Sequence, residues 1–101
     1  MKLYRFHPAA LAEYQAAIDW YAERSLVAAA ALGVLVERGI HEVRQHPLAS
    51  PTWPGFEDIR RRTLRGYPYS IVYLVEPAEI VILGVAHHKR RTGYWLQRTG
   101  R

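Results

Sequence analysis

The chain has 101 residues, half of them apolar and 12% aromatic, which suits one small domain with a hydrophobic core. It contains no cysteine, which excludes disulfides and thiolate chemistry, and its longest apolar run, Leu26 to Val36, is too short to span a bilayer. The net charge is +5. We therefore expect a single soluble domain over residues 1–101, located in the cytoplasm.

The first half of the chain predicts a strand followed by two helices. Residues 2–6 are short and aromatic enough for a strand, and Pro8 is tolerated in the first turn of a helix. Apolar residues then recur at steps of three and four, which predicts an amphipathic helix of about four turns: Leu11, Tyr14, Ile18 and Tyr21. Trp20 lies off this stripe and is expected to fill the seam between the two helices.

Ser25 is a suitable N-cap for the second helix, and His46-Pro47 is expected to end it. Its apolar positions again follow the helical period: Leu32, Leu35, Val36, Ile40 and Val43. The connection around Arg24 and Ser25 is so short that the two helices should form an antiparallel hairpin.

Residues 46–58 are rich in proline and predict a loop whose Trp53 and Phe56 contact the edge of the core. Three strands should follow, at residues 59–64, 69–75 and 80–86, joined by turns short enough for an antiparallel meander. The last strand is apolar on both faces, as expected of a central strand covered by helices.

Residues 94–98 predict a short final helix or turn, which Trp95 should pack against the sheet. We thus expect an α+β fold: an N-terminal strand, an antiparallel helical hairpin packed on a mainly antiparallel four-stranded sheet, and this C-terminal turn.

Charge is distributed unequally along the chain. Residues 1–58 carry five Lys/Arg and seven Asp/Glu, a net charge of −2, whereas residues 59–101 carry nine and two, a net charge of +7. No acidic residue follows Glu79. A surface of one sign attracts phosphates or carboxylates; the alternative is a solvated basic face that only maintains solubility.

The residues after the last strand are the main candidate site. His87-His88-Lys89-Arg90-Arg91 places two groups that titrate near neutrality beside three fixed cations, and Tyr94-Trp95 follow. This cluster suits a polyanion or an acidic protein better than an apolar small molecule. Adjacent histidines on a strand face opposite sides, and the other histidines lack carboxylates at ligand spacing, so we expect neither a metal nor another cofactor.

Several segments together resemble one protein family. Tyr69-Ser70-Ile71-Val72-Tyr73, then residues 80–91, then Tyr94-Trp95 are similar to the RelE/ParE superfamily of type II toxins, and the likeness extends over nearly the whole chain. The resemblance implies a growth-inhibiting toxin, neutralised by an antitoxin that an adjacent gene encodes and that folds onto the toxin. The net positive charge of residues 59–101 agrees with an antitoxin that binds through an acidic segment.

The superfamily contains two activities. RelE-like members cut messenger RNA on the ribosome, which requires a general base, a general acid and fixed cations around one phosphate. Ingredients for this chemistry are Arg61, His88, Arg90 and Tyr94. Compared with the RelE pattern, however, Ser70 and Thr63 stand where cations are expected, which weakens the nuclease interpretation.

ParE-like members poison DNA gyrase and need a recognition surface rather than a catalytic constellation. His87-x-x-Arg90-Arg91, followed shortly by Trp95, favours this side of the superfamily by resemblance. The residues expected to bind the target are Arg60, Arg62, Arg65, His87, His88, Lys89, Arg90 and Arg91. On a strand, Arg61 faces away from Arg60 and Arg62, so the three arginines cannot all belong to one site. We expect the functional side of the strand to be the one that faces solvent beside His88 and Arg90. A third possibility is a small basic nucleic-acid-binding module without toxicity.

Overall fold

Two helices and four strands follow one another in the predicted order in the computed structural model, which describes residues 1–100. The elements are β1 (Leu3–Phe6), α1 (Pro8–Ala22), α2 (Leu26–Gln45), β2 (Ile59–Thr63), β3 (Tyr69–Val75), β4 (Glu79–His87) and a 3-10 turn, η1 (Leu96–Thr99). The α+β prediction is confirmed, including the C-terminal turn.

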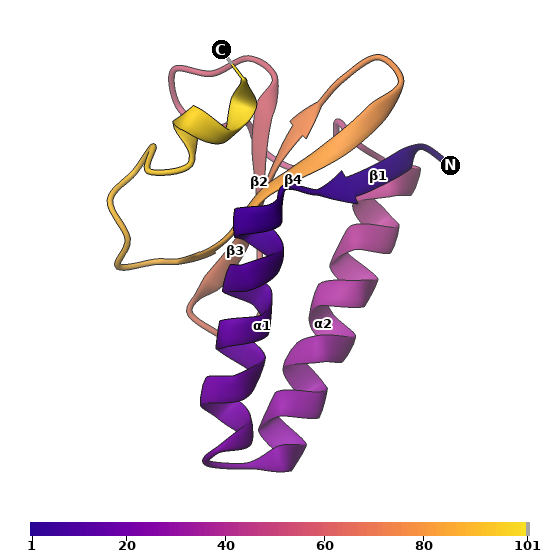
Figure 1. Cartoon of the computed structure of the whole chain (residues 1–101). Coiled ribbons are helices and arrows are strands. Elements are labelled where there is room, and N and C mark those ends of the chain that lie inside the picture. Colours follow the sequence, from indigo (N-terminus) through magenta and orange to yellow (C-terminus); the bar gives the residue numbers. More distant parts are fainter. Residues whose placement is uncertain (101) are drawn as a thin grey trace.

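The two helices form the expected antiparallel hairpin and run side by side below the sheet (Figure 1). Each begins at a capped residue: His7 Nδ1 accepts the Ala9 N–H at 3.1 Å, and Ser25 Oγ accepts the Ala28 N–H at 3.1 Å. These caps satisfy N–H groups that have no partner inside a helix. α2 ends at Gln45, directly before His46-Pro47.

The sheet has the strand order β1-β4-β3-β2, in which β1 pairs with β4 in parallel and the other pairs are antiparallel. The β3–β4 register shifts between Val72 and Tyr73, so Leu83 has no partner in β3. The extra residue is a β-bulge, which turns Leu83 and Gly84 to the same face of the sheet.

The helix-facing core packs α2 residues such as Leu32 and Val36 against Ile71, Tyr73 and Ile82, and all five are fully buried. The sequence predicts that helices cover both faces of the last strand. This is wrong for the face that points away from α1 and α2. There Trp95, which is fully buried, packs on the sheet, and Trp53 and Phe56 meet its ring at 5.4 and 5.6 Å.

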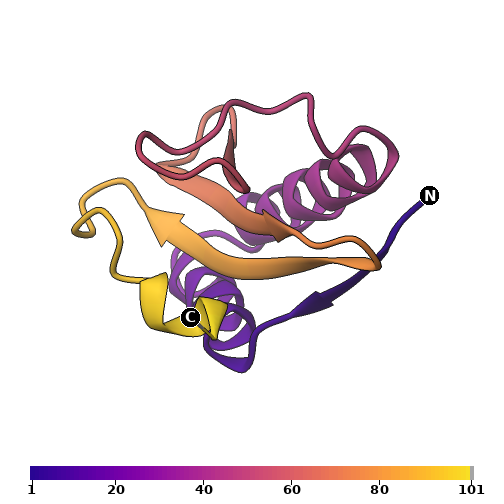
Figure 2. The same cartoon turned by 90° about the horizontal axis from the view of Figure 1, so that it is seen from above.

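A hairpin with so short a connection covers one face only, so aromatic side chains of irregular segments cover the second. Figure 2 shows the C-terminal segment in yellow beside β4 and the start of α1. The predicted roles of Trp53, Phe56 and Trp95 are confirmed.

The prediction that Trp20 fills the helical seam is wrong, because its side chain is 49% exposed. Tyr14 and Ile18 fill the seam instead, where they approach Gly33 of α2. Trp20 stacks against the Arg24 guanidinium at 3.6 Å on the outer surface. Within residues 1–100, no helix combines the length and the apolar character needed to cross a membrane.

Candidate functional site

A row of small side chains crosses three strands on the face away from the helices. Thr63 of β2 lies opposite Ser70 of β3, which lies opposite Ala86 of β4. Their small volume leaves a groove of about 440 Å³, here called the histidine groove. Its lining comprises Pro51, Trp53, Arg61, Thr63, Ser70, Ala86, His87, His88, Arg90, Arg91, Thr92, Tyr94 and Trp95.

A chain of hydrogen bonds between two hydroxyls and the His88 imidazole forms the floor of the histidine groove. The Ser70 hydroxyl, whose residue is 4% exposed, lies 3.0 Å from His88 Nε2 and 3.2 Å from the Thr63 hydroxyl. The backbone N–H of His88 donates to Pro68 O at 2.9 Å, which fixes the main chain that carries the imidazole. Thr63 and Ser70 therefore orient His88 but bring no charge.

Cationic side chains form part of the walls of the groove, and none of its lining residues carries a carboxylate. The Arg61 guanidinium lies 4.9 Å from the Trp53 ring, and the Arg90 guanidinium lies 3.9 Å from the Tyr94 ring. Arg90 also lies 3.9 Å from the Glu13 carboxylate, which pulls it toward α1. The groove can bind an anionic group, but Arg90 is partly neutralised by Glu13.

The Tyr94 hydroxyl points into the protein. It lies over Gly84, where a built Cβ would be 3.2 Å from the hydroxyl and 3.4 Å from Glu13 Oε1. The hydroxyl is buried, and within residues 1–100 it makes no hydrogen bond of good geometry, although the Glu13 carboxylate is close enough to interact with it. Burial raises the pKa of Tyr94 to about 12, and the charge of Glu13 adds to the increase.

Glu13 and Arg98 form a largely buried ion pair that the sequence analysis did not predict. Arg98 donates to both Glu13 oxygens, at 3.0 and 3.1 Å, and each side chain is 16% exposed. The pair also closes the free edge of β4 beyond β1: Arg98 donates to Leu83 O, and Val85 N–H donates to Glu13. Gly84, a glycine inside an apolar strand, was the sequence signal for this close approach.

The structure divides the predicted target-binding residues. His87, His88, Arg90 and Arg91 line the histidine groove. Arg61, which was predicted only as part of a nuclease site, lines it as well. Arg60 donates instead to Leu48 O and Ser50 O, at 3.2 and 2.6 Å, and thus holds the loop.

Other predicted residues also lie apart from the groove floor. Arg62 pairs with Glu42 of α2. His87 lines the groove, but its ring packs edge-on against Tyr69 at 5.1 Å. Arg65 and Lys89 are exposed and absent from the lining of the histidine groove. Of the three consecutive arginines, only Arg61 meets the criterion of lying beside His88 and Arg90. No group of three or more potential metal ligands gathers anywhere in residues 1–100.

The strand order, the helical hairpin and the basic strand ends together define a toxin of the RelE/ParE superfamily. The sequence matches the family described as "ParE toxin of type II toxin-antitoxin system, parDE" over residues 4–92. The chain belongs to this ParE toxin family. The protein is therefore a type II toxin, and its partner is a cognate antitoxin.

A solved structure of the chromosomal ParDE toxin–antitoxin system from P. aeruginosa has the same fold. The two chains are 20% identical, with a TM-score of 0.73, and the match covers 86% of this chain and 96% of that chain. None of the curated proteins compared with the sequence matches it significantly.

Proposed function

We propose that this toxin inhibits growth by binding and poisoning DNA gyrase, and that it performs no catalysis of its own. The surface that contacts the target comprises the cations and the imidazole of the histidine groove, namely Arg61, His88, Arg90 and Arg91. Family membership supports the toxin class, and the character of the groove supports recognition rather than chemistry.

One observation carries the proposal: the floor of the groove is the Thr63–Ser70–His88 hydrogen-bond chain, in which two of the three side chains are uncharged hydroxyls. Cleavage of RNA without a metal builds up negative charge on a phosphorane, which fixed cations must stabilise. Two positions that could supply such cations are hydroxyls here. A site without them loses several kcal/mol of stabilisation, if each cation contributes roughly 2 to 3 kcal/mol.

The second candidate is a ribosome-dependent nuclease, favoured by the hydrogen-bonded His88 beside Arg61. Against it, the Tyr94 hydroxyl is buried, and a pKa of about 12 makes it a poor proton donor or acceptor at neutral pH. His88 would then have to act as the acid or base without a matched partner.

The deciding experiment incubates the purified toxin with gyrase and supercoiled plasmid and, separately, with programmed ribosomes. We expect trapped gyrase–DNA complexes in the first reaction, reduced by Arg61→Ala, and intact messenger RNA in the second. Ribosome-dependent cleavage that His88→Ala abolishes would overturn the proposal in favour of the nuclease.

The toxin class predicts a neighbouring reading frame that encodes the antitoxin. We expect its product to have a DNA-binding N-terminal half and an acidic or amphipathic C-terminal half. Expression of the toxin alone should stop growth, and co-expression of the neighbour should restore it. Normal growth with soluble, full-length protein would instead favour the non-toxic nucleic-acid-binding module.

A further inference from the structure

Residues 89–98, called the 89–98 segment below, bring Arg90 and Tyr94 to the wall of the histidine groove. The backbone hydrogen bonds that this segment donates close short turns: Arg90 N–H donates to His87 O at 2.9 Å, and Tyr94 N–H donates to Arg91 O at 3.2 Å. Such turns give the segment its shape but do not attach it to the sheet. Side-chain contacts therefore decide where Arg90 is placed.

One carboxylate connects the segment to both α1 and β4. Glu13 of α1 accepts two hydrogen bonds from Arg98, at 3.0 and 3.1 Å, and its Oε2 lies 3.9 Å from a guanidinium nitrogen of Arg90. The backbone N–H of Val85 donates to Glu13 Oε1 at 3.1 Å, so the carboxylate is itself fixed to the strand. Two arginines of the segment are thus directed toward one anchored negative charge.

The contacts of Arg90 restrain it without removing its charge. Its guanidinium carbon lies 3.9 Å from the centre of the Tyr94 ring, an arrangement in which a guanidinium stacks on an aromatic ring. Arg98 occupies both oxygens of Glu13, which leaves Arg90 only the longer contact. The Arg90 side chain is 54% exposed, so its positive charge stays accessible to a binding partner.

We propose that Glu13 is a positioning residue for target binding, which holds Arg90 on the wall of the histidine groove before the target arrives. The proposal rests on the proposed function, in which Arg90 is one of the target-binding cations. An arginine that is already held in place loses less conformational entropy on binding, which favours the complex. Glu13 is not among the residues that line the groove, so it acts through Arg90 rather than by direct contact.

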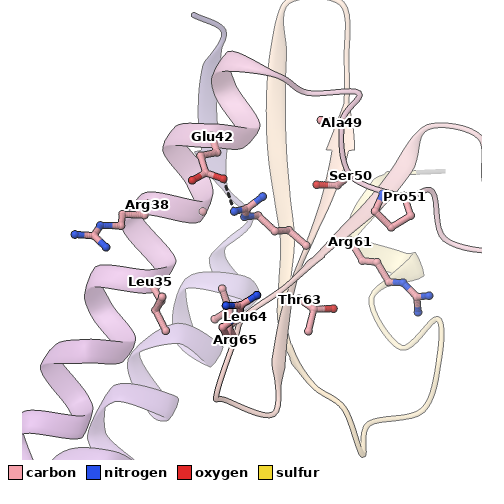
Figure 3. Close-up of a pocket in the computed structure, with 12 residues that line it drawn as sticks. Leu35, Arg38, Glu42, Ala49, Ser50, Pro51, Arg61, Thr63, Leu64 and Arg65 are labelled. Carbon is pink, nitrogen blue, oxygen red and sulfur yellow. Dashed lines mark hydrogen bonds and ion pairs between the residues drawn. The ribbon is translucent and has the colours of Figure 1, made fainter.

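The second helix offers a matched control. Glu42 of α2 pairs with Arg62 in a different groove, of about 630 Å³, and Arg62 does not line the histidine groove (Figure 3). In Figure 3, the Arg61 side chain extends away from Glu42. Glu13→Gln and Glu42→Gln each remove one negative charge, so both increase the long-range attraction of an acidic target to a similar extent. A difference between the two variants therefore reports the placement of Arg90.

The first test measures the toxin concentration that traps half of the gyrase on DNA at physiological salt. We expect Glu13→Gln to require about fivefold more toxin than Glu42→Gln. Arg90→Ala should weaken trapping about tenfold in the parent but less than about twofold in the Glu13→Gln background, where Arg90 has already lost its position. Arg61→Ala, at a cation that Glu13 does not contact, should weaken trapping by the same factor in both backgrounds.

A Glu13 side chain that only stabilises the fold would give a different result. Its loss would lower the amount of folded toxin, which near-ultraviolet circular dichroism measures, and Arg90→Ala would keep the factor that it has in the parent. That outcome would overturn the proposal. Equal trapping by Glu13→Gln and Glu42→Gln would overturn it as well.

A second test needs no variant and no target. Nitrogen relaxation of the arginine Nε–H groups in the free parent toxin reports how ordered each side chain is on the picosecond to nanosecond timescale. We expect Arg90 to be clearly more ordered than Arg91, the next residue, which is exposed on the same turn. Equal mobility of the two arginines would overturn the proposal, even if Glu13→Gln fails to fold.

The two tests separate this inference from the proposed function. If the parent traps gyrase and the effects of Glu13→Gln and Arg90→Ala are independent, the inference fails while the proposed function stands. If even the parent traps no gyrase, the proposed function fails, and the order of Arg90 in the free toxin decides the inference.

Discussion

Gly84 permits the close approach of three side chains to β4. A Cβ there would lie 3.2 Å from the Tyr94 hydroxyl, and a methyl group at that position would press on Glu13 as well. We expect Gly84→Ala to reduce the free energy of unfolding by about 1 to 3 kcal/mol, as overpacking does. Denaturant unfolding measures this directly.

Gly33→Ala is the matched control. Its Cβ would meet Tyr14 at 3.7 Å and Ile18 at 3.9 Å, which are ordinary contacts, and alanine favours a helix over glycine by about 1 kcal/mol. The control should be neutral or stabilising. A Gly84→Ala protein as stable as the parent would contradict the tight packing of Tyr94.

Tyr94 predicts a specific loss of stability in alkali. Its pKa is about 12 in the folded protein and about 10 in an unfolded chain, so the folded state retains the proton longer. Stability is unaffected below about pH 10 and falls as the pH rises toward 12, by roughly 1 to 2 kcal/mol.

Tyr94→Phe should remove this part of the alkaline loss. Because the buried hydroxyl makes no hydrogen bond of good geometry, the variant should be about as stable as the parent at neutral pH. Unfolding curves at about pH 8 and about pH 11 test both statements. Parallel losses in the two proteins would show that the hydroxyl is not buried in solution.

At the scale of elements, the C-terminal segment depends on an ion pair for its attachment to β4. Glu13→Gln leaves the Arg98 guanidinium in a site that is 16% exposed with no opposite charge. We expect a loss of about 2 to 4 kcal/mol, since removing one partner of a buried pair is costly.

Glu23→Gln provides the comparison, because Glu23 pairs with Arg24 on the surface, where its side chain is 76% exposed. That substitution should cost less than about 1 kcal/mol. The ratio of the two losses, measured by thermal unfolding, distinguishes an anchor from an ordinary surface pair. Equal losses would be evidence against the anchor.

The aromatic cover of the second sheet face should be essential, unlike the exposed aromatic of the hairpin. Trp95 is fully buried between Trp53 and Phe56, so Trp95→Ala should cost about 3 to 5 kcal/mol. Trp20 is 49% exposed, so Trp20→Ala should cost roughly 1 kcal/mol. Near-ultraviolet circular dichroism should lose the packed tryptophan signal only in the first variant.

At the scale of the whole molecule, the two halves of the chain carry net charges of opposite sign. The helical hairpin belongs to the net-acidic half, and the three strands that frame the histidine groove belong to the half with a net charge of +7. A partner that neutralises this half should stabilise the fold, because it binds the folded chain only. At a concentration of one hundred times its Kd, the antitoxin should add about 2.7 kcal/mol to the free energy of unfolding.

That stabilisation should weaken with salt, because the exposed arginines of the histidine groove are screened at high ionic strength. Calorimetric melting of the complex at low and high salt measures it. A salt-independent shift would indicate that apolar contacts, rather than the arginines, dominate the partner interface.

The sequence by itself determined the order and type of the elements, because helical periods, caps, prolines and strand alternation are local properties that need no knowledge of distant contacts. Family resemblance likewise rested on short local segments. The tertiary structure decided which of three consecutive arginines joins His88, that Trp20 is exposed, and that Glu13 and Arg98 meet on the edge of β4. These outcomes depend on register, on a bulge at Leu83 and on which segments cover the second face of the sheet, and such long-range pairings are not encoded in any local pattern.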